Sequence, residues 1–114
     1  MRTVEELIED VSEIADWAFM RVSAFPPYPG DMGTQMVRAM DSVGANLSEG
    51  TGRGRNSEKV KLQFFSYALG SAYEASYWLK RCMDRKYIQT TEGTIREMDL
   101  TKIVYELGLI FENG

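Results

Sequence analysis

The sequence contains no histidine and a single cysteine, Cys82. Without histidine, neither a Ser-His nor a Cys-His catalytic pair can form, and the Glu-x-x-His ligand pairs of di-iron helix bundles are absent as well. A lone cysteine has no intrachain disulfide partner, which is typical of a reducing cytoplasm. The composition therefore excludes most of the enzymology of helical bundles, and we predict neither a metal site nor a cofactor.

Cys82 has two candidate environments. Arg81 and Arg85 lie close to it in the sequence and would lower its pKa if the thiol were exposed. Its phase with Leu79 and Met83 on a helix favours a thiol in the core instead. We adopt the core interpretation.

Long apolar runs are also missing, since none approaches the roughly 20 residues that a membrane span needs. The N-terminal residues include Glu5 and Glu6 where a signal peptide would need an apolar stretch. We therefore expect a soluble, cytoplasmic protein with no membrane segment and no export signal. Its 114 residues are enough for one ordinary core, so we predict one domain over residues 1–114.

The charge is unevenly distributed. The net charge of −4 argues against a dedicated nucleic-acid binder, which needs a basic surface. Residues 1–16 carry one basic against six acidic groups, and residues 92–114 carry two against five. Residues 51–61 carry four basic groups and one acidic group, and residues 80–86 carry the same numbers. These two segments place positive charge near both ends of the third predicted helix.

Apolar residues recur at spacings of three and four, which predicts amphipathic helices. The expected helices cover residues 4–22, 32–49 and about 57–87, with a fourth after the break at residues 89–91. The candidate N-caps are Thr3 for the first helix, Asp31 or Thr34 for the second, and Asn56 or Ser57 for the third. The apolar stripe expected to be buried in the fourth helix is Ile95, Met98, Ile103, Val104, Leu107, Ile110 and Phe111. With short connections, this pattern predicts an all-α, up-down-up-down antiparallel four-helix bundle.

Proline and glycine mark the connections. Paired prolines make residues 24–30 an extended connector, in which Phe25 and Tyr28 would anchor the chain to the bundle end or, as the less favoured alternative, dock a partner. Gly44 within the second helix predicts close approach of a neighbouring helix. The glycines of residues 50–56 are expected to end that helix and to permit positive φ. A phosphate cradle is disfavoured, because this turn follows a helix and lacks a Gly-Lys-Ser/Thr ending.

Polar residues form a stripe that the second and third predicted helices share. The candidate members are Arg38, Ser42, Asn46 and Glu49 on the second helix, with Ser71 and Glu74 on the third. We favour a structural network in which Arg38 pairs with Glu49 or Glu74. The alternative is a catalytic cleft that uses Arg38 and the two carboxylates.

Aromatic and methionine residues exceed what the interior of a small bundle needs, with 11% aromatic residues and seven methionines. Each is more often a core or subunit contact than part of a ligand cage. Their excess predicts a second buried face and therefore a homo-oligomer.

Two motifs in this region carry a family resemblance: Asn46-x-x-Glu49-Gly50 and Gly70-Ser71-x-x-Glu74. Together with Arg38 and Ser42, they make the chain similar to bacterial four-helix-bundle proteins encoded by intervening sequences of large-subunit ribosomal RNA genes. The accessory protein of diversity-generating retroelements resembles the same family.

The resemblance implies a four-helix protomer, a homopentameric ring or barrel, and no established enzyme activity. For the retroelement protein it also implies binding of a reverse transcriptase and of nucleic acid. The present chain departs from that protein in charge, because it is acidic whereas the retroelement protein is strongly basic.

We therefore predict a non-catalytic oligomeric scaffold or adaptor with a protein partner, and the alternative is an enzyme that uses Glu49, Glu74 and Arg38. RNA is a second candidate partner, and a reverse-transcriptase-like protein is another. A nucleic-acid site would lie at the start of the third helix, formed by Arg53, Arg55, Lys59 and Lys61. The alternative, which we favour, is that this turn is solvated and that its charges only keep the protein soluble.

Overall fold

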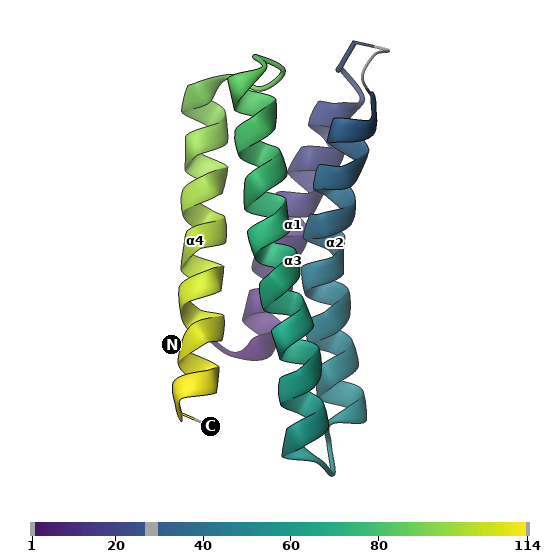
Figure 1. Ribbon diagram of the computed structural model, residues 1–114, viewed down its shortest axis with the longest axis vertical. Coiled ribbons are helices and arrows are strands. Elements are labelled where there is room, and N and C mark those ends of the chain that lie inside the picture. The colour runs from purple at the N-terminus through teal and green to yellow at the C-terminus, as the bar shows by residue number, and fades with distance from the viewer. Residues whose placement is uncertain (1, 27–29, 114) are drawn as a thin grey trace.

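A computed structural model describes residues 2–26 and 30–113, without the side chains of residues 30, 112 and 113. These residues form four α-helices: α1 (Val4–Val22), α2 (Gly30–Arg53), α3 (Glu58–Asp84) and α4 (Thr90–Asn113). Successive helices run antiparallel along the long axis of a body measuring 46 × 22 × 18 Å (Figure 1). The predicted all-α, up-down-up-down bundle is confirmed.

Helix α1 begins and ends where the sequence pattern places it. Thr3 is its N-cap, and the Thr3 side chain accepts a hydrogen bond from the Glu6 backbone N–H at 3.1 Å. The Glu6 carboxylate accepts one from the Thr3 N–H at 3.0 Å, which completes a capping box. This backbone hydrogen bond from Thr3 lowers the pKa of Glu6.

Helix α2 begins earlier than predicted. Asp31 and Thr34 were expected as N-caps, but α2 starts at Gly30, so both residues lie inside the helix. The connector before it is held by Phe25, whose half-buried ring lies 5.4 Å from the ring of Tyr87 in the α3–α4 connection. Phe25 thus contacts the bundle end as predicted, and Tyr28 lies outside the described residues.

The glycine-rich segment after Leu47 does not behave as predicted. Helix α2 continues through Gly50 and Gly52 to Arg53, and no described glycine has a positive φ. A Cβ atom added to Gly50 would lie 2.9 Å from Phe64 Cβ, and one added to Gly54 would lie 2.4 Å from Lys61 Cβ. These two glycines therefore permit close approach of α2 and α3, rather than a left-handed backbone.

Helix α3 starts as predicted at one of its two candidate caps. Ser57 is the N-cap, and its hydroxyl accepts a hydrogen bond from the Val60 N–H at 3.2 Å. The inner face of α3 is built largely from alanines, Ala68, Ala72 and Ala75, all fully buried. Small side chains on this face let α2 and α3 pack closely along most of their length.

The core runs the length of the bundle and receives side chains from every helix. Its largest fully buried members include Leu7 and Ile14 from α1, Met36 and Leu47 from α2, and Phe65 from α3. Cys82 is also fully buried, which confirms the core interpretation, and burial raises the pKa of its thiol to about 11. A thiol in this state is not a reactive one.

Some residues predicted to be buried are exposed. In α4, Ile95 and Met98 are 60% and 57% exposed, whereas Leu100, Ile103 and Leu107 face the core. Phe19 of α1, which lies on the apolar stripe of that helix, is 65% exposed. The error arises because α4 carries two apolar stripes, and the spacing rule does not identify which stripe faces inward.

Gly44 faces α1 but is packed less tightly than predicted. An added Cβ would lie 3.5 Å from Val11 Cγ1, an ordinary van der Waals distance. We therefore expect Gly44→Ala to raise the free energy of unfolding by about 1 kcal/mol, because alanine favours a helix interior. Urea denaturation measures the change. A lower stability would show that the α1–α2 contact cannot accommodate a methyl group.

Candidate functional site

The predicted polar stripe is brought together only in its centre. The half-buried Ser71 hydroxyl donates a hydrogen bond to Ser42 Oγ at 2.9 Å, which links α3 to α2. Asn46 Nδ2 donates to the Ser42 backbone oxygen at 2.9 Å and to Ser42 Oγ at 3.1 Å. Ser42, Asn46 and Ser71 thus satisfy one another at the α2–α3 contact, where an unpaired polar group would destabilise the fold.

The three charged members of the stripe are exposed and take no part in these hydrogen bonds. Glu49 accepts a hydrogen bond from Arg53 Nε at 2.6 Å, and Glu74 accepts one from Trp78 Nε1 at 3.1 Å. Arg38 makes no ion pair with any described residue. The expected pairing of Arg38 with Glu49 or Glu74 within one chain is therefore wrong. Each carboxylate instead has a partner on its own helix.

The basic turn is partly neutralised by neighbouring acids. Arg53 pairs with Glu49, and its guanidinium carbon lies 5.9 Å from the centre of the Phe64 ring. Lys61 Nζ lies 3.3 Å from a Glu58 carboxylate oxygen. Over the described part of the chain, Arg55 and Lys59 form no ion pair, and both are exposed. Two of the four predicted nucleic-acid-binding residues therefore keep an uncompensated charge.

A hollow of about 440 Å³ adjoins this turn and reaches the start of α1. Arg55 and Lys61 line it, but so do Glu5 and Glu58. The walls carry both signs of charge, so this end of the bundle is not a uniformly basic surface.

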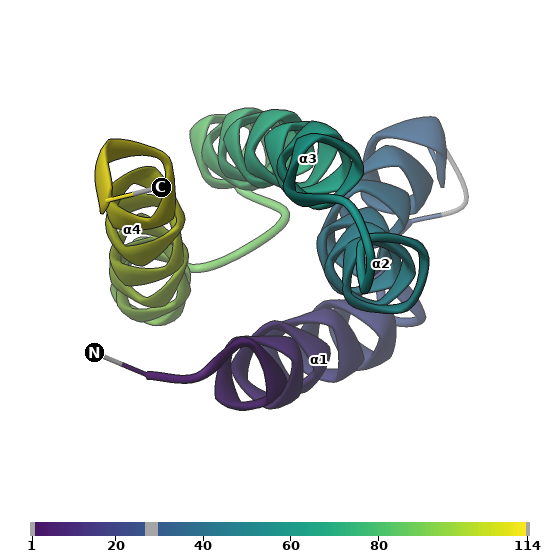
Figure 2. The same cartoon turned by 90° about the horizontal axis from the view of Figure 1, so that it is seen from below.

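A charged seam that the sequence did not predict joins α1 to α4. At one end, Arg2 binds Glu106 of α4 and Asp10 of α1. At the other end, Arg21 forms an ion pair with Glu92. Figure 2, which views the bundle along its axis, shows that α1 and α4 lie next to each other and complete the ring of four helices.

Trp17 and Arg96 reinforce the Arg21 end of this seam. Trp17 Nε1 donates a hydrogen bond to Glu92 Oε1 at 2.6 Å, and the Arg96 guanidinium carbon lies 5.2 Å from the centre of the Trp17 ring. Glu92 is 71 residues away from Arg21 in the sequence. No local pattern signals a pairing at that separation, which is why the spacing analysis missed it.

The two seam carboxylates on α4, Glu92 and Glu106, have pKa values below the ordinary range. The hydrogen bond from Arg21 is the main cause for Glu92, and the hydrogen bond from Arg2 is the main cause for Glu106. A carboxylate with a lowered pKa in the folded state stabilises the fold above its unfolded pKa, and this stabilisation is lost as the pH falls through the folded value.

We therefore expect stability to decrease as the pH falls from about 5 towards 3, the range in which carboxylates titrate. Glu92→Gln should reduce the slope of this decrease, because it removes one of the titrating groups. The measurement is the melting temperature of both proteins across that range. Parallel curves for the two proteins would show that the seam does not contribute to acid sensitivity. The matched control is Glu5→Gln, which makes the same change at an exposed site outside the seam.

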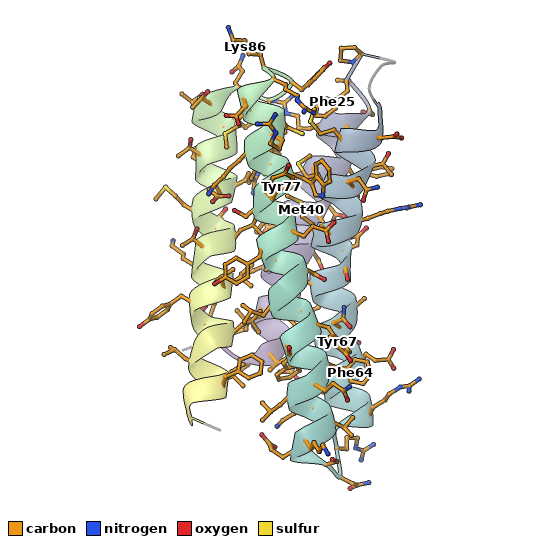
Figure 3. The ribbon with its side chains drawn as sticks, in the orientation of Figure 1. Phe25, Met40, Phe64, Tyr67, Tyr77 and Lys86 are labelled. Carbon is orange, nitrogen blue, oxygen red and sulfur yellow. The ribbon has the colours of Figure 1, made fainter. Side chains whose placement is uncertain are left out.

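The outer surface of the α3–α4 hairpin carries most of the exposed large apolar side chains. Of the eight large hydrophobic residues that are exposed among those described, six lie on these two helices. They are Tyr67, Tyr73 and Tyr77 on α3 and Ile95, Met98 and Tyr105 on α4. Tyr67 and Tyr77 project from the side of α3 that faces the viewer in Figure 3. We call these six residues the hairpin surface.

Helix α4 is apolar on two opposite sides. Its inner stripe is Leu100, Ile103 and Leu107, all fully buried. Its outer stripe has Ile95, Met98 and Tyr105 at spacings of three and seven residues, which is the spacing of a helix-packing seam. Exposed Thr101 and Lys102 lie between Met98 and Tyr105, so the outer stripe is apolar at its two ends and polar between them.

Two further kinds of site are absent from the described part of the chain. It contains no group of three or more His, Cys, Asp or Glu side chains placed to hold a metal ion. None of its helices combines the length and the apolar character needed to cross a membrane.

The fold and these surfaces define a class: an antiparallel four-helix bundle with an inter-helix serine–asparagine network and an apolar outer surface. The family model of the 23S rRNA-intervening sequence proteins matches residues 24–108. The chain therefore belongs to the 23S rRNA-intervening sequence protein family, as the motifs of α2 and α3 indicated. No curated protein matches the sequence.

A solved structure supports the same assignment. It is the crystal structure of a protein of unknown function from the S23 ribosomal protein family of Bacteroides thetaiotaomicron VPI-5482. The two chains are 25% identical, with a TM-score of 0.80 over 95% of this chain and 97% of that one. The likeness thus extends over all four helices.

Proposed function

We propose that this protein is a non-catalytic, homo-oligomeric scaffold of the cytoplasm that presents repeated copies of its bundle to a protein partner. The observation that carries the proposal is the hairpin surface, where six large apolar side chains are each 49–67% exposed in the single chain. Aromatic residues and methionine are enriched at protein interfaces, and charged residues are depleted at their centres. Five of the six side chains of the hairpin surface are tyrosine or methionine.

A second copy of the chain is the occupant that we infer for the hairpin surface. Ile95, Met98 and Tyr105 lie on the outer side of a helix whose inner stripe is already buried, so assembly would bury apolar side chains on both sides of α4. The resemblance to homopentameric relatives suggests five subunits. We favour a scaffold over the enzymatic alternative, since Glu49 and Glu74 each bind a residue on their own helix and neither forms an ion pair with Arg38.

Substitution on the hairpin surface tests the proposal. Met98→Glu places a charge in the outer stripe of α4 and should weaken self-association at least tenfold, because the charge would lose its water on assembly. Met20→Glu is the matched control: the same change at an exposed methionine of α1, outside the hairpin surface. Light scattering after size exclusion measures the mass of each protein. If both variants retain the mass of an assembled wild type, the hairpin surface is not where subunits meet.

RNA is the second candidate partner, and two side chains favour it. Arg55 and Lys59 are exposed near the N-terminus of α3 and form no ion pair within the described chain. A symmetric assembly would repeat this pair of charges in every subunit, and the contact would be electrostatic and would weaken as salt rises.

Two double variants test RNA binding with the same loss of charge. Arg55→Ala with Lys59→Ala should abolish retention of a structured RNA at low salt. Arg53→Ala with Lys61→Ala removes two cations that already have acidic partners, so it should have the smaller effect. Equal RNA binding by the two variants, or no RNA binding by the wild type, would show that Arg55 and Lys59 do not form an RNA site.

A further inference from the structure

A groove between α1 and α2 is an apolar surface that the scaffold proposal does not explain. It has a volume of about 270 Å³ and is lined by Phe19, Val22 and Val37, with Arg38 at its edge. Phe19 is 65% exposed, so its ring is available to a partner. Arg38 is exposed and has no ion-pair partner in the described part of the chain. The groove therefore combines an apolar floor with one free positive charge.

The outer side of α3 has the complementary features. Tyr73 and Tyr77 are exposed there, and between them lies Glu74, which forms no ion pair with a described residue. Gly70 lies one helical turn before them, and a Cβ added to it would meet no atom within 4 Å. Glycine in a helix interior costs about 1 kcal/mol relative to alanine, and no contact within the chain requires it at this position.

We propose that the α3 ridge formed by Gly70, Tyr73, Glu74 and Tyr77 docks into the α1–α2 groove of a second copy, where Glu74 pairs with Arg38. The tyrosine rings cover the apolar floor, and Gly70 allows the two backbones to approach closely. Each of the two charges supplies the ion-pair partner that the other lacks among the described residues of its own chain. This inference rests on the proposed function, because it identifies the surfaces through which the scaffold assembles.

The geometry makes the contact heterologous. Ridge and groove lie on different helices, and Figure 2 shows α3 on the side of the bundle away from α1. Each copy therefore offers one ridge and one groove, and successive copies join ridge to groove. Such a contact yields a closed ring when the rotation closes, whereas a self-complementary patch yields a dimer.

Charge reversal tests the pairing. Arg38→Glu and Glu74→Arg each place like charges in contact, so each should raise the dissociation constant of the assembly at least tenfold. The double variant restores an attractive pair with its sign reversed and should assemble as the wild type does. Arg55→Glu and Glu9→Arg make the same changes of charge at exposed positions outside both surfaces, and they should leave assembly unchanged. Circular dichroism checks that each variant stays helical.

The outcomes separate this inference from the proposed function. A wild type that assembles while both single variants assemble equally well would overturn the ridge-and-groove contact and leave the scaffold proposal standing. Single variants that dissociate without rescue in the double variant would also overturn the Arg38–Glu74 pairing. A wild type that stays monomeric at every concentration would overturn both. A stable dimer would contradict the heterologous contact.

Discussion

Gly54→Ala is expected to lower the free energy of unfolding by about 1–3 kcal/mol, the usual cost of forcing extra atoms into a packed site. The added methyl group would lie 2.4 Å from the Gly50 carbonyl oxygen and 2.7 Å from Lys61 Cα. Both are backbone atoms. Relief at Lys61 requires α3 to move away from the turn, and relief at Gly50 requires the last turn of α2 to change, since the Gly54 N–H donates to that carbonyl. The φ angle of Gly54 is not positive, so the effect is purely steric.

Gly52→Ala is the matched control for this prediction. A Cβ at Gly52 meets no atom within 4 Å, and the residue lies within α2. We expect the variant to be up to about 1 kcal/mol more stable than the wild type, because alanine is the better helix former. Guanidinium denaturation of both variants gives the comparison. Equal effects at the two positions would mean that the turn is flexible enough to absorb a methyl group anywhere.

Leu100→Ala is expected to destabilise the protein by about 2–5 kcal/mol, because it leaves a cavity at a fully buried site. The loss should be the same at every protein concentration, since Leu100 faces the core of its own bundle. Met98→Ala changes the other side of α4, where the side chain is 57% exposed in the single chain. In a monomer such a change usually alters stability by less than about 0.5 kcal/mol.

The dependence of the melting temperature on protein concentration distinguishes the outer side of α4 from its inner side. If a second copy covers Met98, then Met98→Ala lowers the melting temperature of the assembled protein, and the difference shrinks on dilution as subunits part. Thermal melts at several protein concentrations measure this behaviour. A Met98→Ala variant that melts with the wild type at all concentrations would show that the outer stripe stays in water.

The helices could be predicted from the sequence because their signals are local. Thr3 and Ser57 cap α1 and α3 through side-chain hydrogen bonds that reach only three residues along the chain. Apolar spacing likewise identifies each helix from its own residues. The glycines near the end of α2 were misinterpreted because glycine permits both a positive φ and close packing. Only the position of α3 shows which of these two roles a glycine has. The position of α3 depends on tertiary packing, which local sequence does not reveal.

The site was less predictable for the same reason. Helical phase placed Ser42 and Asn46 on one face, and these residues do meet Ser71 across the helix contact. Shared phase did not make Arg38 a partner of Glu49, because 11 residues of helix separate the two by about 16 Å. Arg53, one turn from Glu49, forms the ion pair instead. Helical phase also could not identify Glu92 as the partner of Arg21, because α1 and α4 meet only after the whole chain has folded.

The mass of the unmodified protein in solution tests the central claim most directly. One chain has a mass of 13.0 kDa. We predict that light scattering after size exclusion, over a series of micromolar concentrations, gives a constant multiple of this mass, and the family resemblance sets that multiple at five. A mass of 13.0 kDa at every concentration would contradict the account, because the hairpin surface would then remain in water and the bundle would have no second copy to join.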